Sequence, residues 1–345
     1  MIYNKLILLL ILFLTGCYQN ETMQKKDYIF GTIVEVTIYG ETEEKSTHAI
    51  ELVFNEFRRL HHYLHPWEKS IIQEINQSIK NQEIYTTQDT EILTIIKHNQ
   101  ELELKTHGYF NPAIGNLIEA WGFHADQFSE DRPNSILIES LRRNLPHMSE
   151  INIYNGYLES KNENIKLDLG GYSKGYALDR AKKILAENNI NNALINIGGN
   201  ILALGLHGDR NWIVGIQHPR KPNSIASISL KPGWSIGTSG DYQRYFIVDN
   251  QRYSHLIDPN TGYPANNSQS ATILLPPIES SGTLSDVYSK PLFIASEKLK
   301  YKIAKELGVD FYMIVMADGK ISISRSMLNL IKWHEKIDKK NITVH

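Results

Sequence analysis

The segment Leu167–Ala181 (LDLGGYSKGYALDRA) places two adjacent glycines and a lysine between a short apolar run and a helical pattern. We interpret its first residues as the end of a strand and residues 172–188 as a helix. Gly170 and Gly171 can adopt positive φ and let backbone N–H groups face a ligand. A helix N-terminus attracts anions such as phosphate, and Lys174 would add a positive charge there. The alternative is a plain strand–helix turn, and the spacing matches neither G-x-G-x-x-G nor a Walker A loop.

A second candidate is His255, just before the turn sequence Asp258–Gly262 (DPNTG). An imidazole at a strand end can project into a cleft. Its ordinary pKa near 6.5 suits a general base for a hydroxyl nucleophile. The alternative is a histidine that is merely packed in the core or at the surface.

Two weaker candidates follow along the chain. In GTSGDYQRYF, Ser239 and Gly240 offer hydroxyl and backbone donors, but the G-x-S-x-G elbow of a hydrolase nucleophile is absent. Asp286 and Lys290 are four residues apart on an expected helix. The carboxylate could hold Mg²⁺ beside a phosphate, or the two side chains could form a surface ion pair.

The N-terminus is a separate unit. Residues 1–16 have a lysine and then the apolar run Leu6–Leu14, which is shorter than the roughly 20 residues that span a bilayer. The run ends in LTGC and resembles the lipobox of bacterial lipoproteins, in which Cys17 becomes lipidated. A plain signal peptide is the alternative. We expect residues 17–27 to be a polar tether and the protein to be extracytoplasmic, lipid-anchored to a bacterial membrane (on the periplasmic face in a Gram-negative cell).

Composition excludes several other classes. The chain has 345 residues and a formal net charge of −2, without the basic stripe of a nucleic-acid-binding protein. Cys17 is the single cysteine, which excludes an internal disulfide and a later thiol nucleophile.

Hydrophobic periodicity outlines the remaining chain, residues 28–345, as one α+β unit. Helices are expected at residues 43–64, 90–105, 135–143, 172–188, 281–295 and 297–307, with a short one after the loop at 110. Many short β-like runs after residue 151 predict largely antiparallel sheet with helices packed on its faces.

Taken in order, these segments resemble the ApbE family of FAD:protein FMN transferases. The matching stretches are DLGGYSKGYALD (168–179), GGN (198–200), SGDYQRYF (239–246), SHLIDPNTGYP (254–264) and SDVYSK (285–290). Phe30-Gly31-Thr32, residues 67–76 and residues 110–123 also resemble family segments. The resemblance implies an ApbE-like (T-fold-like) single catalytic unit that binds FAD as its substrate.

The implied reaction transfers FMN from FAD to a threonine or serine hydroxyl of a target protein, with AMP released. The family's usual targets are membrane-bound electron-transport subunits. His255 would be the general base, and Lys174 would contact the pyrophosphate. Gly171, Asp286 and Lys290 fall at the Mg²⁺ positions. The remaining FAD-pocket positions are Phe30, Tyr63, Trp67, Asn111, Pro112, Ala113, Asp168, Ser239, Gly240 and Ile257.

Several positions depart from the family pattern. Lys290 stands where the family has a metal-ligating threonine, and Asn200, Asn111 and Ala113 also differ from it. A charged ammonium has no lone pair for Mg²⁺. Lys290 therefore either takes the metal's place as a fixed cation, or Mg²⁺ binds weakly through Asp286 and water. FAD binding without transfer, and FAD pyrophosphatase activity, are the alternative functions.

Overall fold

The computed structural model describes residues 22–125 and 132–345. Its helices are α1 (Glu43–Tyr63), α2 (Ile71–Lys80), α3 (Thr90–Lys105), α4 (Gly115–Ala120), α5 (Ser135–Arg143), α6 (Ser173–Glu187), α7 (Ser281–Ile294), α8 (Glu297–Glu306) and α9 (Arg325–Leu328).

The central sheet has the order β1-β2-β6-β7-β10-β15-β16-β17-β19. These strands are β1 (Thr22–Ile29), β2 (Thr32–Tyr39), β6 (Ala193–Ile197), β7 (Asn200–Leu204), β10 (Ser235–Gly240), β15 (Ser268–Leu275), β16 (Phe311–Met316), β17 (Ile321–Ile323) and β19 (Ile342–Val344). Neighbours pair antiparallel except β17 and β19, which are parallel. The expectation of an α+β fold with largely antiparallel sheet is confirmed.

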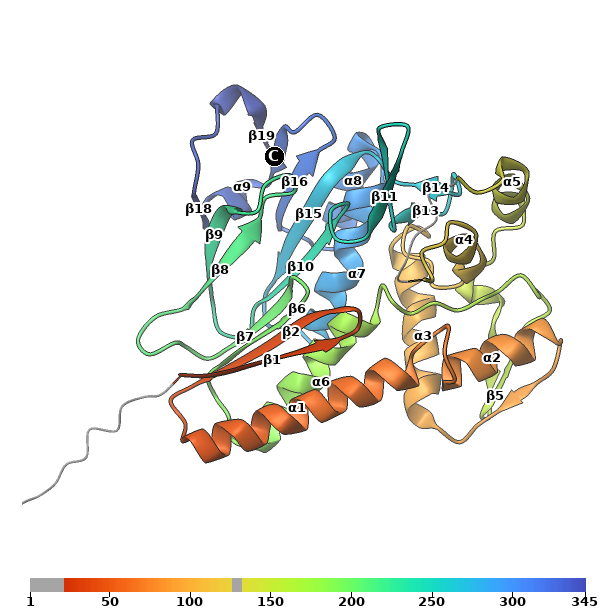
Figure 1. Cartoon of the computed structure of the whole chain (residues 1–345), viewed down its shortest axis with the longest axis horizontal. Coiled ribbons are helices and arrows are strands. Elements are labelled where there is room, and N and C mark those ends of the chain that lie inside the picture. Colours follow the sequence, from red (N-terminus) through yellow and green to blue (C-terminus); the bar gives the residue numbers. More distant parts are fainter. Residues whose placement is uncertain (1–21, 126–131) are drawn as a thin grey trace, which may run out of the picture.

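Smaller sheets surround this one. They are formed by β18-β9-β8 (Ile331–Trp333, Ser224–Leu230 and Trp212–Gln217), β3-β5-β4 (Tyr85–Thr86, Tyr157–Glu159 and Asn152–Tyr154), β11-β12 (Tyr245–Val248 and Gln251–Ser254) and β13-β14 (Ile257–Asp258 and Tyr263–Pro264). In Figure 1, β8 and β9 lie on the opposite side of the molecule from α2, α4 and α5.

The central sheet separates two cores. One core joins the sheet to α1, α6 and α7 through side chains such as Phe57, Leu178 and Phe293. The other joins it to β8, β9 and β18 through Val214, Ile228 and their neighbours. Residues that alternate along a strand point to opposite faces, so β7, β15 and β16 contribute to both cores.

A third cluster packs α4 and α5 against the β11–β12 hairpin. Trp121 stacks on Tyr253 with ring centroids 5.6 Å apart, and its indole N–H donates to the Gly262 carbonyl at 2.8 Å. This cluster holds the turn after His255 in place.

The expected helices are present, with ends that differ by at most one residue. The polar tether was placed too far along the chain, because residues 22–27 belong to β1. That strand is polar itself, but it pairs along its whole length with the apolar β2. Polar side chains of β1 also form hydrogen bonds with those of β2: the Gln24 amide donates to the Glu35 carboxylate at 2.8 Å. The predicted signal peptide and Cys17 lie outside the described residues.

Residues 165–169 were expected to be a strand and are not. Their backbone is held by other partners: Asn76 on α2 bonds both the N–H and the carbonyl of Leu167, and Asp168 N donates to the Pro112 carbonyl at 2.8 Å. The segment therefore runs between α2 and the loop 110–114 instead of joining a sheet. Helix α2 itself was not predicted.

Within the described ranges, no helix is both long and apolar enough to cross a membrane.

Candidate active site

Helices α6 and α7 cap each other's N-termini. Asp286 on α7 accepts a hydrogen bond from Gly175 N at 2.9 Å. Asp179 on α6 accepts from Gly282 N at 2.9 Å, from Thr283 N at 2.8 Å and from the Thr283 hydroxyl at 2.6 Å. Each carboxylate lies where the helix dipole favours negative charge. The two helix starts are thereby locked together beside the diglycine segment.

The two helices cross where glycines permit it. A Cβ on Gly175 would lie 2.6 Å from the Gly282 carbonyl oxygen and 2.7 Å from the Thr283 Cα. These are backbone atoms that cannot move aside easily. Gly175 therefore serves helix packing, and the glycines of the motif have different tasks.

The diglycine is used for close approach and not for positive φ. Neither Gly170 nor Gly171 has a left-handed backbone, which corrects the sequence expectation. A Cβ on Gly171 would lie 2.8 Å from the Cε of Lys290. The lysine side chain therefore passes directly against the Gly171 backbone.

Lys290 and Asp286 form a buried ion pair on α7. The Lys290 ammonium donates to Asp286 Oδ1 at 2.6 Å and to the Asp286 carbonyl oxygen at 2.8 Å. Burial lowers the pKa of Lys290, while the Asp286 charge opposes this effect. The alternative of a surface ion pair is therefore wrong, because the pair of Asp286 and Lys290 is buried. The Asp286 carboxylate also caps α6.

His255 lies near three positive charges. Burial lowers the pKa of His255 below its ordinary value, and Lys174, Arg244 and Lys290 lower it further. Its Nδ1 is 3.1 Å from the Arg244 carbonyl oxygen. A carbonyl oxygen only accepts, so Nδ1 carries the proton and Nε2 has the free lone pair. The neutral imidazole is in the form that a general base requires.

Asp168 lies at the other side of the diglycine. Its Oδ1 accepts from Gly170 N at 2.8 Å, and its carboxylate also bonds the Trp67 side chain. Burial raises the pKa of Asp168, and these hydrogen bonds and the charges of Arg244 and His65 oppose that rise. Asp168 is therefore hydrogen-bonded to Trp67 and lies within the field of the Arg244 charge.

Ser239 supports the ion pair on α7. Its hydroxyl lies 2.7 Å from the Ser289 hydroxyl, and Ser289 donates to the Asp286 carbonyl at 2.8 Å. Because the Ser289 proton is used there, Ser239 must be the donor to Ser289. Gly240 is buried, and a Cβ there would lie 2.3 Å from a Tyr242 ring atom. Neither residue offers a nucleophile.

The residues that are expected to surround the flavin lie in different environments in the structure. Phe30, at φ 56°, packs its ring 6.1 Å from Phe57 and remains partly exposed. The Tyr63 hydroxyl instead donates to Asp89 at 2.6 Å, at the N-cap of α3. Lys166 Nζ lies 4.3 Å from the Trp67 ring centroid, close enough for a cation–π contact.

The Asn111–Ala113 segment is buried and acts on the backbone. The Asn111 side chain accepts from Ala113 N at 2.9 Å and donates to the Pro146 carbonyl at 2.9 Å. Ala113 is fully buried and Ile257 is 4% exposed, so neither has surface to offer a ligand. Pro112 and Ala113 hold residues 166–168 through their carbonyls, and the contact of these positions with FAD stays a prediction.

The expected Mg²⁺ ligands do not fit that ion. Both oxygens of Asp286 are already engaged, one by Gly175 N and one by the Lys290 ammonium. Mg²⁺ requires oxygen ligands in near-octahedral geometry, and an ammonium provides none. Over residues 22–125 and 132–345, no group of three or more His, Cys, Asp or Glu side chains could hold a metal.

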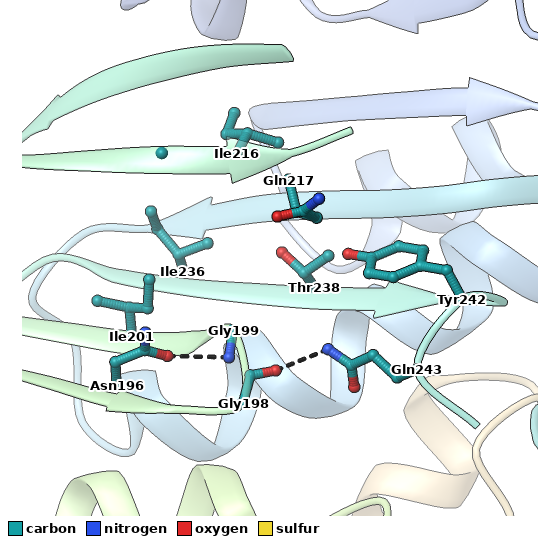
Figure 2. Close-up of a pocket in the computed structure, with 11 residues that line it drawn as sticks. Asn196, Gly198, Gly199, Ile201, Ile216, Gln217, Ile236, Thr238, Tyr242 and Gln243 are labelled. Atoms are coloured by element: carbon teal, nitrogen blue, oxygen red, sulfur yellow. Dashed lines mark hydrogen bonds between the residues drawn. The ribbon is translucent and has the colours of Figure 1, made fainter. Parts of the chain in front are cut away.

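A hollow of about 350 Å³ lies on the other face of the central sheet (Figure 2). It is lined in part by the turn Gly198–Gly199, by Thr238 and by Gln243, whose amide donates to the Gly198 carbonyl at 2.8 Å. Thr238 faces this hollow, while the next residue, Ser239, faces α7. The GGN segment is therefore a tight turn that lines this hollow.

Sequence reasoning missed Asp179, Ser289 and the electrostatic role of Arg244. Asp179 lies in the same motif as Lys174, and its sequence signal is an acidic residue directly after the buried Leu178. Ser289 gave no signal, because its task is visible only once β10 and α7 are packed together.

A sequence model of the ApbE family matches residues 30–313. A Rhodobacter capsulatus protein named FAD:protein FMN transferase is 33% identical over 87% of this chain and 56% of its own length. An Escherichia coli K12 protein of the same name is 28% identical over 64% of this chain and 63% of its own length. The chain thus spans less than two thirds of the length of either relative.

A crystal structure of the ApbE protein from Thermotoga maritima has the same fold. The TM-score is 0.80 at 29% identity, and the match covers 90% of this chain and 99% of that one. The matched residues include the diglycine segment, Lys174, His255 and the α7 ion pair. This chain therefore belongs to the ApbE family.

Proposed function

We propose that the protein transfers FMN from FAD to a threonine or serine hydroxyl of an acceptor protein. The observation that carries this proposal is the neutral imidazole of His255 within the field of the Lys174 and Lys290 charges, with the Lys290 side chain lying against Gly171. Cations at this place suit a pyrophosphate, and the imidazole can accept a proton next to it.

The chemistry is a substitution at phosphorus. The acceptor oxygen attacks the phosphorus on the FMN side of the pyrophosphate, and the bond from this phosphorus to the bridging oxygen breaks. FMN becomes ester-linked to the acceptor, and AMP leaves with the bridging oxygen. The hydroxyl proton passes to Nε2 of His255, whose orientation is fixed by the Nδ1 bond to Arg244.

Positive charge stabilises the transition state. Lys174 lies in the first turn of α6, where helix N–H groups add to its charge. Positioning and charge supply most of the catalysis in phosphoryl transfer. No step of this scheme requires a further side-chain nucleophile.

The acceptor and the cellular address belong to the same proposal. A lipid on Cys17 would hold the enzyme at the outer side of a bacterial membrane. A membrane-bound electron-transport subunit with an extracytoplasmic flavin domain would be an accessible acceptor there. Strand β1 begins at Thr22, so only a short linker would separate Cys17 from the folded unit.

The test mixes the purified protein, FAD and an acceptor domain that carries a threonine flavinylation motif. We expect flavin fluorescence on the acceptor after denaturing electrophoresis, with one AMP released per label. FAD that stays bound without AMP release would identify a flavin carrier. Free FMN without any acceptor would identify a pyrophosphatase.

A further inference from the structure

Lys290 occupies a position that the family resemblance assigns to a metal ligand. Its ammonium donates to Asp286 Oδ1 and to the Asp286 carbonyl oxygen. An ammonium has three N–H donors, so these bonds leave one for a ligand. The side chain is largely buried, at 11% exposure.

The ammonium is held rigidly. The carbonyl that accepts from it is fixed a second time by the Ser289 hydroxyl, which in turn accepts from Ser239 on β10. The lysine stem lies against the Gly171 backbone, where no Cβ would fit without movement. Sheet, helix and diglycine segment therefore all position the charge.

The ammonium and the catalytic groups share one electrostatic environment. The charge of Lys290 acts on His255, and the charge of Lys174 acts on both residues. The Lys290 stem lies against Gly171, three residues before Lys174, so a pyrophosphate bound at the Gly171 backbone would lie close to the Lys290 charge.

Each oxygen of Asp286 already accepts from a donor with which a divalent cation would have to compete. Its second oxygen caps α6 through Gly175 N at 2.9 Å. A cation at Oδ1 would have to displace the ammonium, which lies 2.6 Å away. Like charges disfavour binding both at once.

We propose that the Lys290 ammonium acts as a built-in cation for the FAD pyrophosphate, in place of a bound Mg²⁺ ion. FAD binding and FMN transfer by this protein are then independent of divalent cations. This inference rests on the proposed function for the identity of the ligand.

The first measurement is the affinity of the full chain for FAD, followed by quenching of flavin fluorescence. We expect the Kd in EDTA and in excess Mg²⁺ to agree within about 3-fold, because the cation is part of the chain. Transfer to the acceptor domain is expected to be equally insensitive. A tightening of FAD binding by Mg²⁺ of about 10-fold or more would overturn the inference.

The second measurement uses Lys290→Thr, which restores a hydroxyl and frees Asp286 Oδ1. We expect FAD binding in EDTA to weaken by about 10-fold or more, and Mg²⁺ to recover most of that loss. Lys183→Thr is the matched control, because Lys183 pairs with Glu187 at i,i+4 spacing on the exposed side of α6. It should resemble the unchanged protein in both buffers.

The outcomes separate this inference from the proposed function. FAD binding that is cation-independent without transfer supports the role of Lys290 and removes the transferase. Transfer that requires Mg²⁺ supports the transferase and removes the role of Lys290. If Lys290→Thr does not fold, which circular dichroism would show, the Mg²⁺ titration of the unchanged protein decides the matter.

Discussion

At the residue scale, the proposed function assigns FAD binding and proton transfer to two different side chains. His255→Gln should lower transfer by about 10²- to 10⁴-fold, because the general base is lost. FAD affinity should stay within about 3-fold, since the imidazole is neutral and contributes little charge to binding. Lys174→Gln should mainly raise the Kd for FAD. Fluorescence titration and AMP release measure the two effects separately, and a His255→Gln protein that fails to bind FAD would assign His255 to binding instead.

The lowered pKa of His255 predicts an unusual pH profile. Protonation removes the Nε2 lone pair, so activity is present above the pKa and lost as the pH falls through it. In the free enzyme that pKa lies below the ordinary value of about 6.5. The acidic limb of kcat/KM for FAD should therefore lie well below pH 6.5. The limb of kcat should lie higher, because a bound pyrophosphate offsets the lysine charges. An acidic limb of kcat/KM at or above pH 6.5 would contradict the burial of this imidazole among cations.

At the element scale, the reciprocal caps of α6 and α7 predict an effect on stability. Asp179→Ala leaves the Gly282 and Thr283 donors without their carboxylate and should lower the free energy of unfolding by about 2 to 4 kcal/mol. Asp318→Ala is the control. Its carboxylate bonds Lys320 in an exposed turn and should cost less than about 0.5 kcal/mol. Urea unfolding measures both, and equal losses would show that the cap is unimportant.

The sequence predicts where helices and strands lie better than it predicts which segments they pack against or bond to. Helices α1, α3 and α5 follow from apolar spacing and from N-cap residues such as Asp89, which accepts from Glu91 N and Ile92 N. The run 165–169 has the composition of a strand, yet its hydrogen bonds go to Asn76 and to the loop at Pro112. The local sequence pattern does not show which of these hydrogen-bond partners the backbone of residues 165–169 takes. For the same reason the motif glycines were recognised, but their tasks in close packing, at Gly171 and Gly175, were not.

At the scale of the whole molecule, one sheet separates the chemistry from a second core. Lys174, Asp286 and Lys290 lie on the helices that cover one face, and β8, β9 and β18 cover the other (Figure 1). Strand β10 touches both sides, with Ser239 toward α7 and Thr238 toward the hollow. The second core can therefore contribute stability without direct contact with the helices that carry Lys174 and Lys290.

This division predicts different outcomes for two buried aliphatic residues. Ile228→Ala in the second core and Leu178→Ala on α6 should each cost about 2 to 5 kcal/mol of unfolding free energy, since both side chains are at most 1% exposed. Ile228→Ala should leave the Kd for FAD unchanged at a temperature where the protein is folded. Leu178→Ala should weaken FAD binding as well, because α6 presents Lys174 and packs its start against α7. Thermal unfolding and fluorescence titration of the same samples measure both quantities. Equal loss of FAD affinity in the two folded variants would contradict this division. It would mean that a change of packing in the second core alters the site through the sheet.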